Sequence, residues 1–209
     1  MHADAQESSG YILLDRFVRR PNKSLAKKTR ELAEIFGVTV CNDDTSKEYA
    51  TDDGDRTLTG ALYNLARMPA FVVELGGPMV VHKEFEDLGV IGVKNVLFSL
   101  GMLKKNWALQ VDQSKIKVNY PLRTCIISAG ERSGFVRYEV KLGAEIKRGQ
   151  RIATISNIFG KVKGDVCSPM HGFMISMGYS AITQPGTMWR YWQLRILIRN
   201  PYKGYGFFV

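Results

Sequence analysis

The stretch Pro69-Ala70-Phe71-Val72-Val73-Glu74-Leu75-Gly76-Gly77 decides the fold class of this 209-residue chain. Ala70–Val73 is continuously apolar, which is typical of a strand buried on both faces of a sheet covered by helices. The glycines after Glu74 indicate that the strand ends there and opens into a loop. Because ligands bind at the carboxyl ends of strands in open α/β sheets, Glu74 is a candidate site residue. Its carboxylate, backed by an apolar strand, suits a general base; the alternative is a glutamate that caps the next turn.

A helix and a strand are predicted upstream of this stretch. Asn22 is a favourable N-cap for a helix over Lys23–Phe36, and Gly37 is placed to end it. Val38–Cys41 contains three successive β-branched residues and predicts a short strand, followed by a polar loop.

Further helices lie on both sides of Glu74. One is predicted after a cap at Thr57 or Thr59, and a longer one over Lys83–Leu103, which Gly89 and Gly92 break or bend. No strand is expected before residue 11. The alternation of helices and strands predicts an α/β fold with a mainly parallel sheet.

The second half of the chain differs in composition. From Val118 the runs are short and rich in Val, Ile and aromatic residues, with frequent glycines, which predicts a small all-β domain. Arg151–Ile155 is expected to be a strand, and Met188–Arg199 an edge or closing strand. Residues 1–115 hold 15 Lys/Arg against 16 Asp/Glu, whereas residues 116–209 hold 14 against 4. This change in charge places the expected domain boundary between residues 115 and 116.

Composition also bears on partners and compartment. A basic domain can meet nucleic acid, but its cations are dispersed among strand-like segments, so a solvated basic face is expected and nucleic acid is not a predicted partner. No apolar run approaches the ~20 residues that cross a bilayer, and the polar start is no signal peptide, so a membrane or secreted class is not expected. Three well-separated cysteines favour a reducing compartment and predict a cytoplasmic protein.

Histidines are few and scattered. His82 and Glu86 lie four residues apart on a predicted helix and could share a metal, but His82 is expected to face solvent. His171 is expected in a surface turn. The chain contains no His-x-x-Glu motif, so three protein ligands for a catalytic zinc cannot be assembled from it alone.

Two stretches in this order resemble the succinylglutamate desuccinylase/aspartoacylase family: Pro69–Gly77 and Leu88–Leu103. The later segment from Ser133 through Lys141–Ala153 to Ser168–Gly172 is similar to the β-rich C-terminal domain of many members. The resemblance implies a zinc-dependent deacylase, with part of a carboxypeptidase-like sheet followed by a small barrel-sandwich-like β domain. It also implies hydrolysis of an N-acyl amino acid or a similar small amide, and a homo-oligomer is possible.

The resemblance further implies which residues act. In the family, two His and one Glu hold one zinc per active site. The Glu of the E-L-G stretch takes a proton from the zinc-bound water and passes it to the leaving amine. That glutamate falls on Glu74, and one zinc-binding histidine falls on His2. Asp4 and Arg16 lie near His2 in the sequence without a motif that assigns them. Because the family's other two ligands lie in an upstream His-x-x-Glu, the chain is expected to be a C-terminal half, a fragment that binds zinc weakly and is inactive alone.

Two alternatives remain open at this point. Biotinyl and lipoyl carriers bear their cofactor on a hairpin lysine about eight residues before an Ala/Ser-Pro, and Lys161 precedes Pro169 by eight. The setting Phe159-Gly160-Lys161-Val162 differs from that of carriers. A non-catalytic binding or assembly module using the basic domain is the other alternative. The aromatic tail Tyr202–Val209 is expected to pack on the β domain or to mediate a subunit contact.

Overall fold

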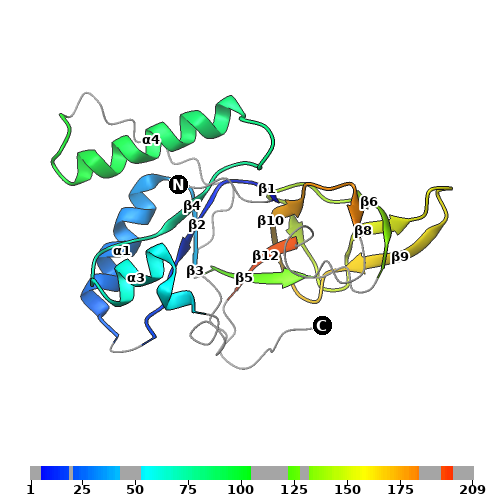
Figure 1. The fold of residues 1–209 in the computed structure, drawn as a ribbon, viewed down its shortest axis with the longest axis horizontal. Helices are drawn as coiled ribbons and strands as arrows, with labels where there is room; N and C mark the ends of the chain where they lie inside the picture. Colours follow the sequence, from blue (N-terminus) through cyan, green and yellow to red (C-terminus); the bar gives the residue numbers. More distant parts are fainter. Residues whose placement is uncertain are drawn as a thin grey trace. The chain divides into compact units, whose positions relative to one another are not determined.

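The structure, a computed structural model, describes residues 6–18, 21–42, 53–104, 122–127, 132–183 and 194–199. The chain forms two compact units, drawn in Figure 1. Unit 1 comprises Met1–His2, Gly10–Leu75 and Val81–Pro121, and unit 2 comprises Ala3–Ser9, Gly76–Val80 and Leu122–Val209. The aromatic tail and residues 188–193 of the expected closing strand lie outside the described residues.

The sheet of unit 1 is mixed. Its strands follow the order β3 (Thr39–Asn42), β2 (Tyr11–Leu14) and β4 (Val72–Glu74). β2 runs parallel to β3 and antiparallel to β4. The α/β class is therefore confirmed, but the expectation of a mainly parallel sheet is wrong for these strands, because strand direction depends on how the long connections return rather than on the strand sequences.

The first helix follows its sequence signals closely. α1 spans Lys23–Phe36, as predicted. The Asn22 Oδ1 atom accepts a hydrogen bond from the Leu25 N–H at 3.0 Å, and Gly37 ends the helix with a φ of 96°, in the left-handed region. The next helical segment among the described residues is a 3₁₀ turn, η1 (Gly54–Arg56), that leads into α3 (Leu58–Asn64). Thr57 caps α3 through its hydroxyl, as one of the two expected caps.

Replacing Asn22 by alanine is expected to lower the free energy of unfolding by about 1 kcal/mol, because the Leu25 N–H loses its acceptor at the helix start. Urea denaturation measures this change. Asn22→Ser is the matched control, since serine also caps helices; an equal loss in both variants would contradict a capping role.

The long helix α4 (Lys83–Ser99) is continuous through Gly89 and Gly92, so the expected break does not occur. Gly92 has a packing role instead: a Cβ atom there would lie 2.3–2.4 Å from ring atoms of Phe36 on α1. The glycine therefore allows α4 to lie close against α1 (Figure 1). The two helices share one core with the sheet, whose buried members are Ile12, Leu14, Ala33, Phe36, Val38, Val73 and Leu88.

Two strands were not expected from the sequence. β1 (Gln6–Ser8) lies before residue 11, so the expectation that no strand precedes this residue is wrong. β2 follows from residue 11 and was not predicted either. All four residues of β2 are buried. A buried strand of this kind shows no apolar–polar alternation, which removes the usual sign of a strand.

Among the described residues, unit 2 consists of strands and turns. One set of strands follows the order β1, β10 (Gly172–Gly178), β12 (Leu194–Arg199) and β5 (Leu122–Ile127), and β7 (Glu145–Ile146) also pairs with β10. The other sheet has the order β11 (Ile182–Thr183), β6 (Gly134–Tyr138), β8 (Arg151–Ser156) and β9 (Val162–Cys167). β8 confirms a predicted strand. β12 pairs on both sides, so it is not an edge strand.

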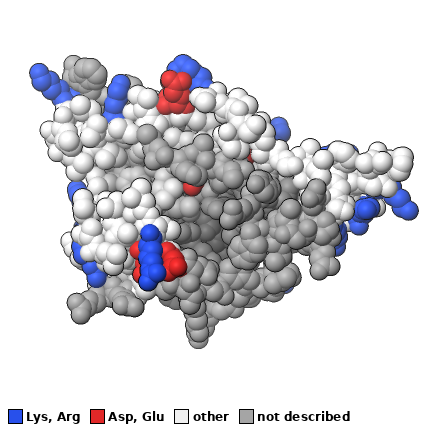
Figure 2. Space-filling view, in the orientation of Figure 1, with Lys and Arg blue, Asp and Glu red and all other residues white. Residues whose placement is uncertain are grey.

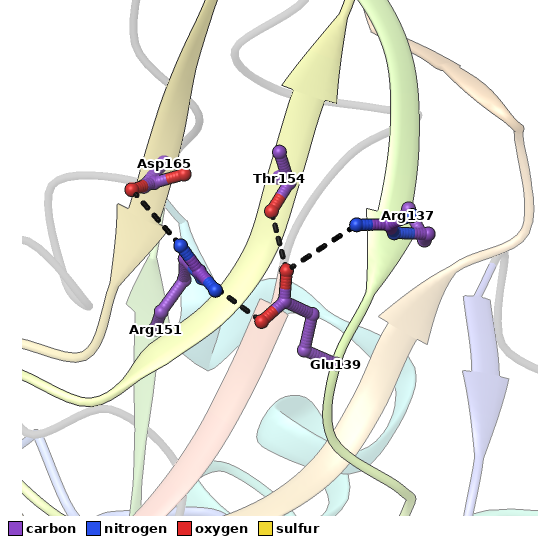
Figure 3. Close-up of polar contacts among 5 residues, drawn as sticks. All are labelled: Arg137, Glu139, Arg151, Thr154 and Asp165. Atoms are coloured by element: carbon purple, nitrogen blue, oxygen red, sulfur yellow. Dashed lines mark hydrogen bonds and ion pairs between the residues drawn. The ribbon is translucent and has the colours of Figure 1, made fainter. Parts of the chain in front are cut away.

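The exposed face of the second sheet carries a polar network centred on Glu139 (Figure 3). Its carboxylate accepts hydrogen bonds from the Thr154 hydroxyl at 2.5 Å and from Arg151 Nε at 2.9 Å, and Arg137 lies 4.0 Å away. Arg151 also contacts Asp165 on β9 at 3.6 Å. The hydrogen bond from Thr154, followed by that from Arg151, lowers the pKa of Glu139 below its ordinary value.

This lowered pKa predicts a specific pH dependence. The folded state holds Glu139 ionised more strongly than the unfolded state does, so its contribution is present above the ordinary pKa and is lost as the pH falls through the lowered value. Glu139→Gln is therefore expected to reduce the fall in melting temperature between about pH 5 and pH 3. Asp165→Asn, on the same face, is the comparison variant. An unchanged pH slope in Glu139→Gln would contradict the assignment.

Candidate functional site

Glu74 lies at the end of β4 and is buried, with 7% of its surface exposed. Leu75 follows, and the chain then turns at Gly76, whose φ of 68° is in the left-handed region. The strand end and the following glycine turn were both expected from the sequence. The burial of an ionisable side chain at a strand end is the feature that marks this position.

Two buried polar residues lie level with Glu74 on the neighbouring strands. Tyr11 on β2 is directly opposite Glu74, and Thr39 on β3 is directly opposite Tyr11. Directly opposite residues place their side chains on the same face of a sheet, so the carboxylate and the two hydroxyl groups share one face. All three residues are buried, and each makes at least one specific interaction such as a hydrogen bond, a ring contact or an electrostatic interaction.

The other face of these strands is apolar. Ile12 and Val73 belong to the core shared with α1 and α4, and Leu75 packs against the same core. Gly10, which precedes β2, has a φ of 80°, and a Cβ atom there would lie 3.6 Å from Phe85 and 3.8 Å from Leu75. The Glu74 carboxylate is thus presented on the face opposite this core, with a rigid apolar layer behind it. Such support holds an acid or base in a fixed position.

The direction of β4 contradicts the expectation that Glu74 lies where the carboxyl ends of parallel strands meet. Because β4 is antiparallel to β2, its carboxyl end lies beside the amino ends of β2 and β3, at Tyr11 and Thr39. Glu74 therefore does not sit at a common carboxyl edge of parallel strands. Its candidacy depends on burial, strand-end position and polar neighbours instead.

The histidines are not brought together. His2, the expected zinc ligand, lies outside the described residues, as does Asp4. His82 is the exposed N-cap residue of α4, with its ring packed edge-on against Phe85, and Glu86 is exposed as well. His171 is exposed in the turn before β10. The expectations that His82 faces solvent and that His171 is a surface turn residue are confirmed.

The described part of the chain does not fit a zinc ion by itself. It contains no group of three or more His, Cys, Asp or Glu side chains placed to hold a metal. A catalytic zinc needs three protein ligands, and the described residues do not supply such a set.

Sequence reasoning missed two residues beside Glu74 and one at the other end of β2. Tyr11 and Thr39 join Glu74 only through strand register, which links residues far apart in the sequence. Asn64, at the end of α3, was also missed: its Nδ2 atom donates to the Arg16 carbonyl at 3.0 Å, and its Oδ1 atom accepts from the Val18 N–H at 2.9 Å. It thereby fixes the segment that leaves β2. An asparagine at a helix end, with no turn motif, gives no sequence signal of such a role.

Comparison with solved structures defines the class of fold. The structure matches a succinylglutamate desuccinylase/aspartoacylase from Rhodobacter sphaeroides with a TM-score of 0.67 and 16% sequence identity, over 96% of this chain and 57% of that chain. The fold is therefore that of the succinylglutamate desuccinylase/aspartoacylase proteins, and the resemblance seen in the sequence is confirmed at the level of fold.

Two further structures agree. The ectoine utilization protein EutE of Ruegeria pomeroyi matches with a TM-score of 0.64 and 16% identity over 94% of this chain and 57% of that one. An aspartoacylase family protein from Mesorhizobium loti matches with a TM-score of 0.58 and 14% identity, over 95% and 61% of the two chains. The chain thus spans a little over half the length of the proteins it matches. No family model and no curated protein sequence matches it.

Two further observations concern the distribution of Lys and Arg on the surface and the length and polarity of the helices. On the face shown in Figure 2, Lys and Arg atoms are dispersed over several places and do not form one continuous patch. Within the described ranges, the helices are too short or too polar to cross a lipid bilayer.

Proposed function

We propose that this chain is the C-terminal part of a zinc-dependent deacylase that hydrolyses the amide bond of an N-acyl amino acid or a similar small amide. The observation that carries the proposal is a buried carboxylate, Glu74, at the end of a strand in a fold shared with succinylglutamate desuccinylase/aspartoacylase proteins. In finer terms, unit 1 is part of a carboxypeptidase-like domain and unit 2 a barrel-sandwich-like domain. The intracellular location expected from the cysteines forms part of the same proposal.

Glu74 has the properties of the proton-transfer group for this reaction. Its side chain is held on a rigid strand, away from the apolar core, with two hydroxyl-bearing residues level with it. A carboxylate in this position takes a proton from the attacking water and delivers it to the leaving amine. Zinc, when bound, would polarise the amide carbonyl and acidify that water. His2 would supply one ligand, and the other two would come from outside this sequence.

The sheet order supports an incomplete catalytic domain. β4 is the terminal strand among the described strands of unit 1, so its outer edge is where a further strand can add. A strand added there would lie beside Glu74. Together with the 57% coverage of the matched chain, this predicts that the 209 residues alone do not hydrolyse amides. The carrier alternative based on Lys161 is not favoured, because the fold matches deacylases.

The test begins with the DNA directly upstream of Met1, searched for an in-frame His-x-x-Glu. The longer chain is then expressed, and its zinc content and its hydrolysis of a panel of N-acyl amino acids are measured beside the 209-residue chain. We expect zinc near one per molecule and turnover only in the longer chain. A zinc-loaded longer chain that hydrolyses no member of the panel, or turnover by the 209 residues alone, contradicts the proposal.

A further inference from the structure

The turn between β8 and β9 is held in place by its own hydrogen bonds. The Asn157 N–H donates to the Lys161 carbonyl at 2.9 Å, and the Gly160 N–H donates to the Asn157 carbonyl at 3.0 Å. The Asn157 Oδ1 atom also accepts from the N–H groups of Phe159 and Lys161, at 3.0 and 2.9 Å. Gly160, with a φ of 78°, supplies the left-handed residue of a tight hairpin loop. The turn therefore holds the two residues between Asn157 and Gly160 in fixed positions.

These two residues, Ile158 and Phe159, form an apolar tip. They are 76% and 86% exposed, among the highest values for large apolar side chains in the described part of the chain. The β8–β9 hairpin extends beyond the other strands of unit 2, so the tip lies at a projecting end (Figure 1). Neither residue contributes to the core of this unit.

More apolar side chains lie on the exposed face of the same sheet. Val162 on β9 is opposite Ser156 on β8, which is opposite Phe135 on β6. Ile182 on β11 is in turn opposite Phe135. Directly opposite residues share a face, so Val162, Phe135 and Ile182 form one apolar row, at the end of the sheet where the hairpin turn begins. They are between 43% and 56% exposed. An exposed apolar surface built from a tip and a row indicates a contact with another surface.

The uncompensated charge beside the tip is positive. Lys161 and Lys163 follow the tip directly; both are exposed, and neither has an ion pair with a described residue. The carboxylates of Glu139 and Asp165, by contrast, both contact Arg151 (Figure 3). On the face shown in Figure 2, the projecting end carries Lys and Arg atoms and no Asp or Glu atoms. The partner that complements this end is therefore anionic.

An anionic lipid surface fits these features better than a protein does. Two copies of the chain that met at their tips would bring their lysines together, and like charges at a contact are unfavourable. Protein interfaces are enriched in arginine and depleted in lysine, whereas both cations after the tip are lysines. A lysine stem can lie along apolar surface while its ammonium group stays among polar groups. A projecting tip also enters a fluid lipid surface without a matching pocket.

We propose that the β8–β9 hairpin binds the surface of lipid bilayers that contain anionic phospholipids. Ile158 and Phe159 enter the boundary between headgroups and acyl chains, while Lys161 and Lys163 contact the lipid phosphates. The contact is made by a turn and two strands at the bilayer surface, so it needs no spanning segment. It is independent of the deacylase assignment, since it uses no residue of the Glu74 site.

The apolar tip and the lysines are both needed for measurable binding. Two side chains bury less apolar surface than one acyl chain, and a single acyl chain alone binds membranes only marginally. Lysines near an anionic bilayer add an attraction that falls off within a Debye length. The binding is therefore reversible, requires anionic lipid and weakens as the salt concentration rises.

Cosedimentation with vesicles tests the proposal. The 209-residue chain is mixed with vesicles of equimolar phosphatidylcholine and phosphatidylserine, or of phosphatidylcholine alone, and the bound fraction gives a partition coefficient. We expect this coefficient to be about tenfold or more higher for the anionic vesicles. Replacing Ile158 and Phe159 together by serine is expected to lower it about tenfold or more. Replacing Lys161 and Lys163 together by glutamine is expected to lower it by about as much.

Matched variants separate this contact from general charge and apolarity. Leu58→Ser in unit 1 removes a side chain as exposed as those of the tip and should leave binding unchanged. Lys23→Gln with Lys28→Gln removes the same net charge from exposed positions on α1 and should have a much smaller effect than the hairpin pair. Phe159→Leu keeps an apolar side chain at the tip and should retain most of the binding. Circular dichroism and melting curves verify that each variant is folded.

A chain that does not bind the anionic vesicles overturns the proposal, and the apolar surface is then assigned to a contact with another protein. Equal binding by the wild type and the serine variant of the tip overturns it as well, because the bilayer would then meet another surface. An equal loss in the two lysine pairs does the same, since net charge alone would explain the binding. Loss of binding in both hairpin variants, with the unit 1 variants unchanged, supports it.

Discussion

Replacing Glu74 by glutamine is expected to lower the turnover number of the complete enzyme by about 10²–10⁴-fold, while bound zinc is retained. Glutamine keeps the volume of the side chain and the strand that carries it, but it cannot accept the proton of the attacking water. Because Glu74 is buried, with 7% of its surface exposed, solvent water cannot easily replace its carboxylate. Steady-state kinetics and metal analysis of the longer chain measure the two quantities.

Glu86→Gln is the matched control for this experiment. Glu86 lies exposed in the first turn of α4, so its substitution should leave both turnover and zinc content unchanged. Unchanged turnover in Glu74→Gln would refute the role given to Glu74. Loss of zinc together with turnover would make this residue a metal ligand and would also contradict the role proposed here.

Replacing Gly92 by alanine is expected to destabilise unit 1 by about 1–3 kcal/mol, as overpacking does in well-packed cores. Alanine favours a helix over glycine by about 1 kcal/mol, so the net sign depends on the contact with Phe36. That contact decides it, because the added Cβ would lie 2.3–2.4 Å from three ring atoms of Phe36. Urea denaturation followed by circular dichroism measures the free energy of unfolding.

A double-mutant cycle isolates this contact. Phe36→Leu removes the ring, so the added methyl group of Gly92→Ala should cost less in that background than in the wild type. The expected coupling between the two substitutions is about 0.5–3 kcal/mol. Gly92→Ala that is neutral or stabilising in the wild-type background would show that the helices separate at little cost.

The parts of the fold that were predictable are those fixed by local chemistry. The start and end of α1 follow from Asn22 and Gly37, because a capping side chain and a left-handed glycine act within one turn of the helix. The continuity of α4 was not predictable from the same rules, since Gly92 is explained by Phe36, which is far away in the sequence. β2 was not predicted because a short, continuously apolar run such as Tyr11–Leu14 is ambiguous between a buried strand and a buried helix segment.

In the candidate site, too, some features were predictable from the sequence and others were not. The position of Glu74 at a strand end was predictable from the apolar run before it and the glycines after it. The direction of β4 was not, because it depends on pairing with β2 across a long connection. Tyr11 and Thr39 join the site only through that pairing. His2 stays a prediction from the resemblance.

The pairing of β1 with β10 has a consequence for biosynthesis. Glu7 lies opposite Met177, so β1 must wait for a partner strand that is synthesised 170 residues later. Until then the early strand leaves the ribosome without its neighbour, with its backbone groups open to other nascent chains. Contacts between such distant segments form slowly, and slow closure prolongs exposure to aggregation. The strands of unit 2 that include β1 are therefore completed only after β10 and β12 have been synthesised.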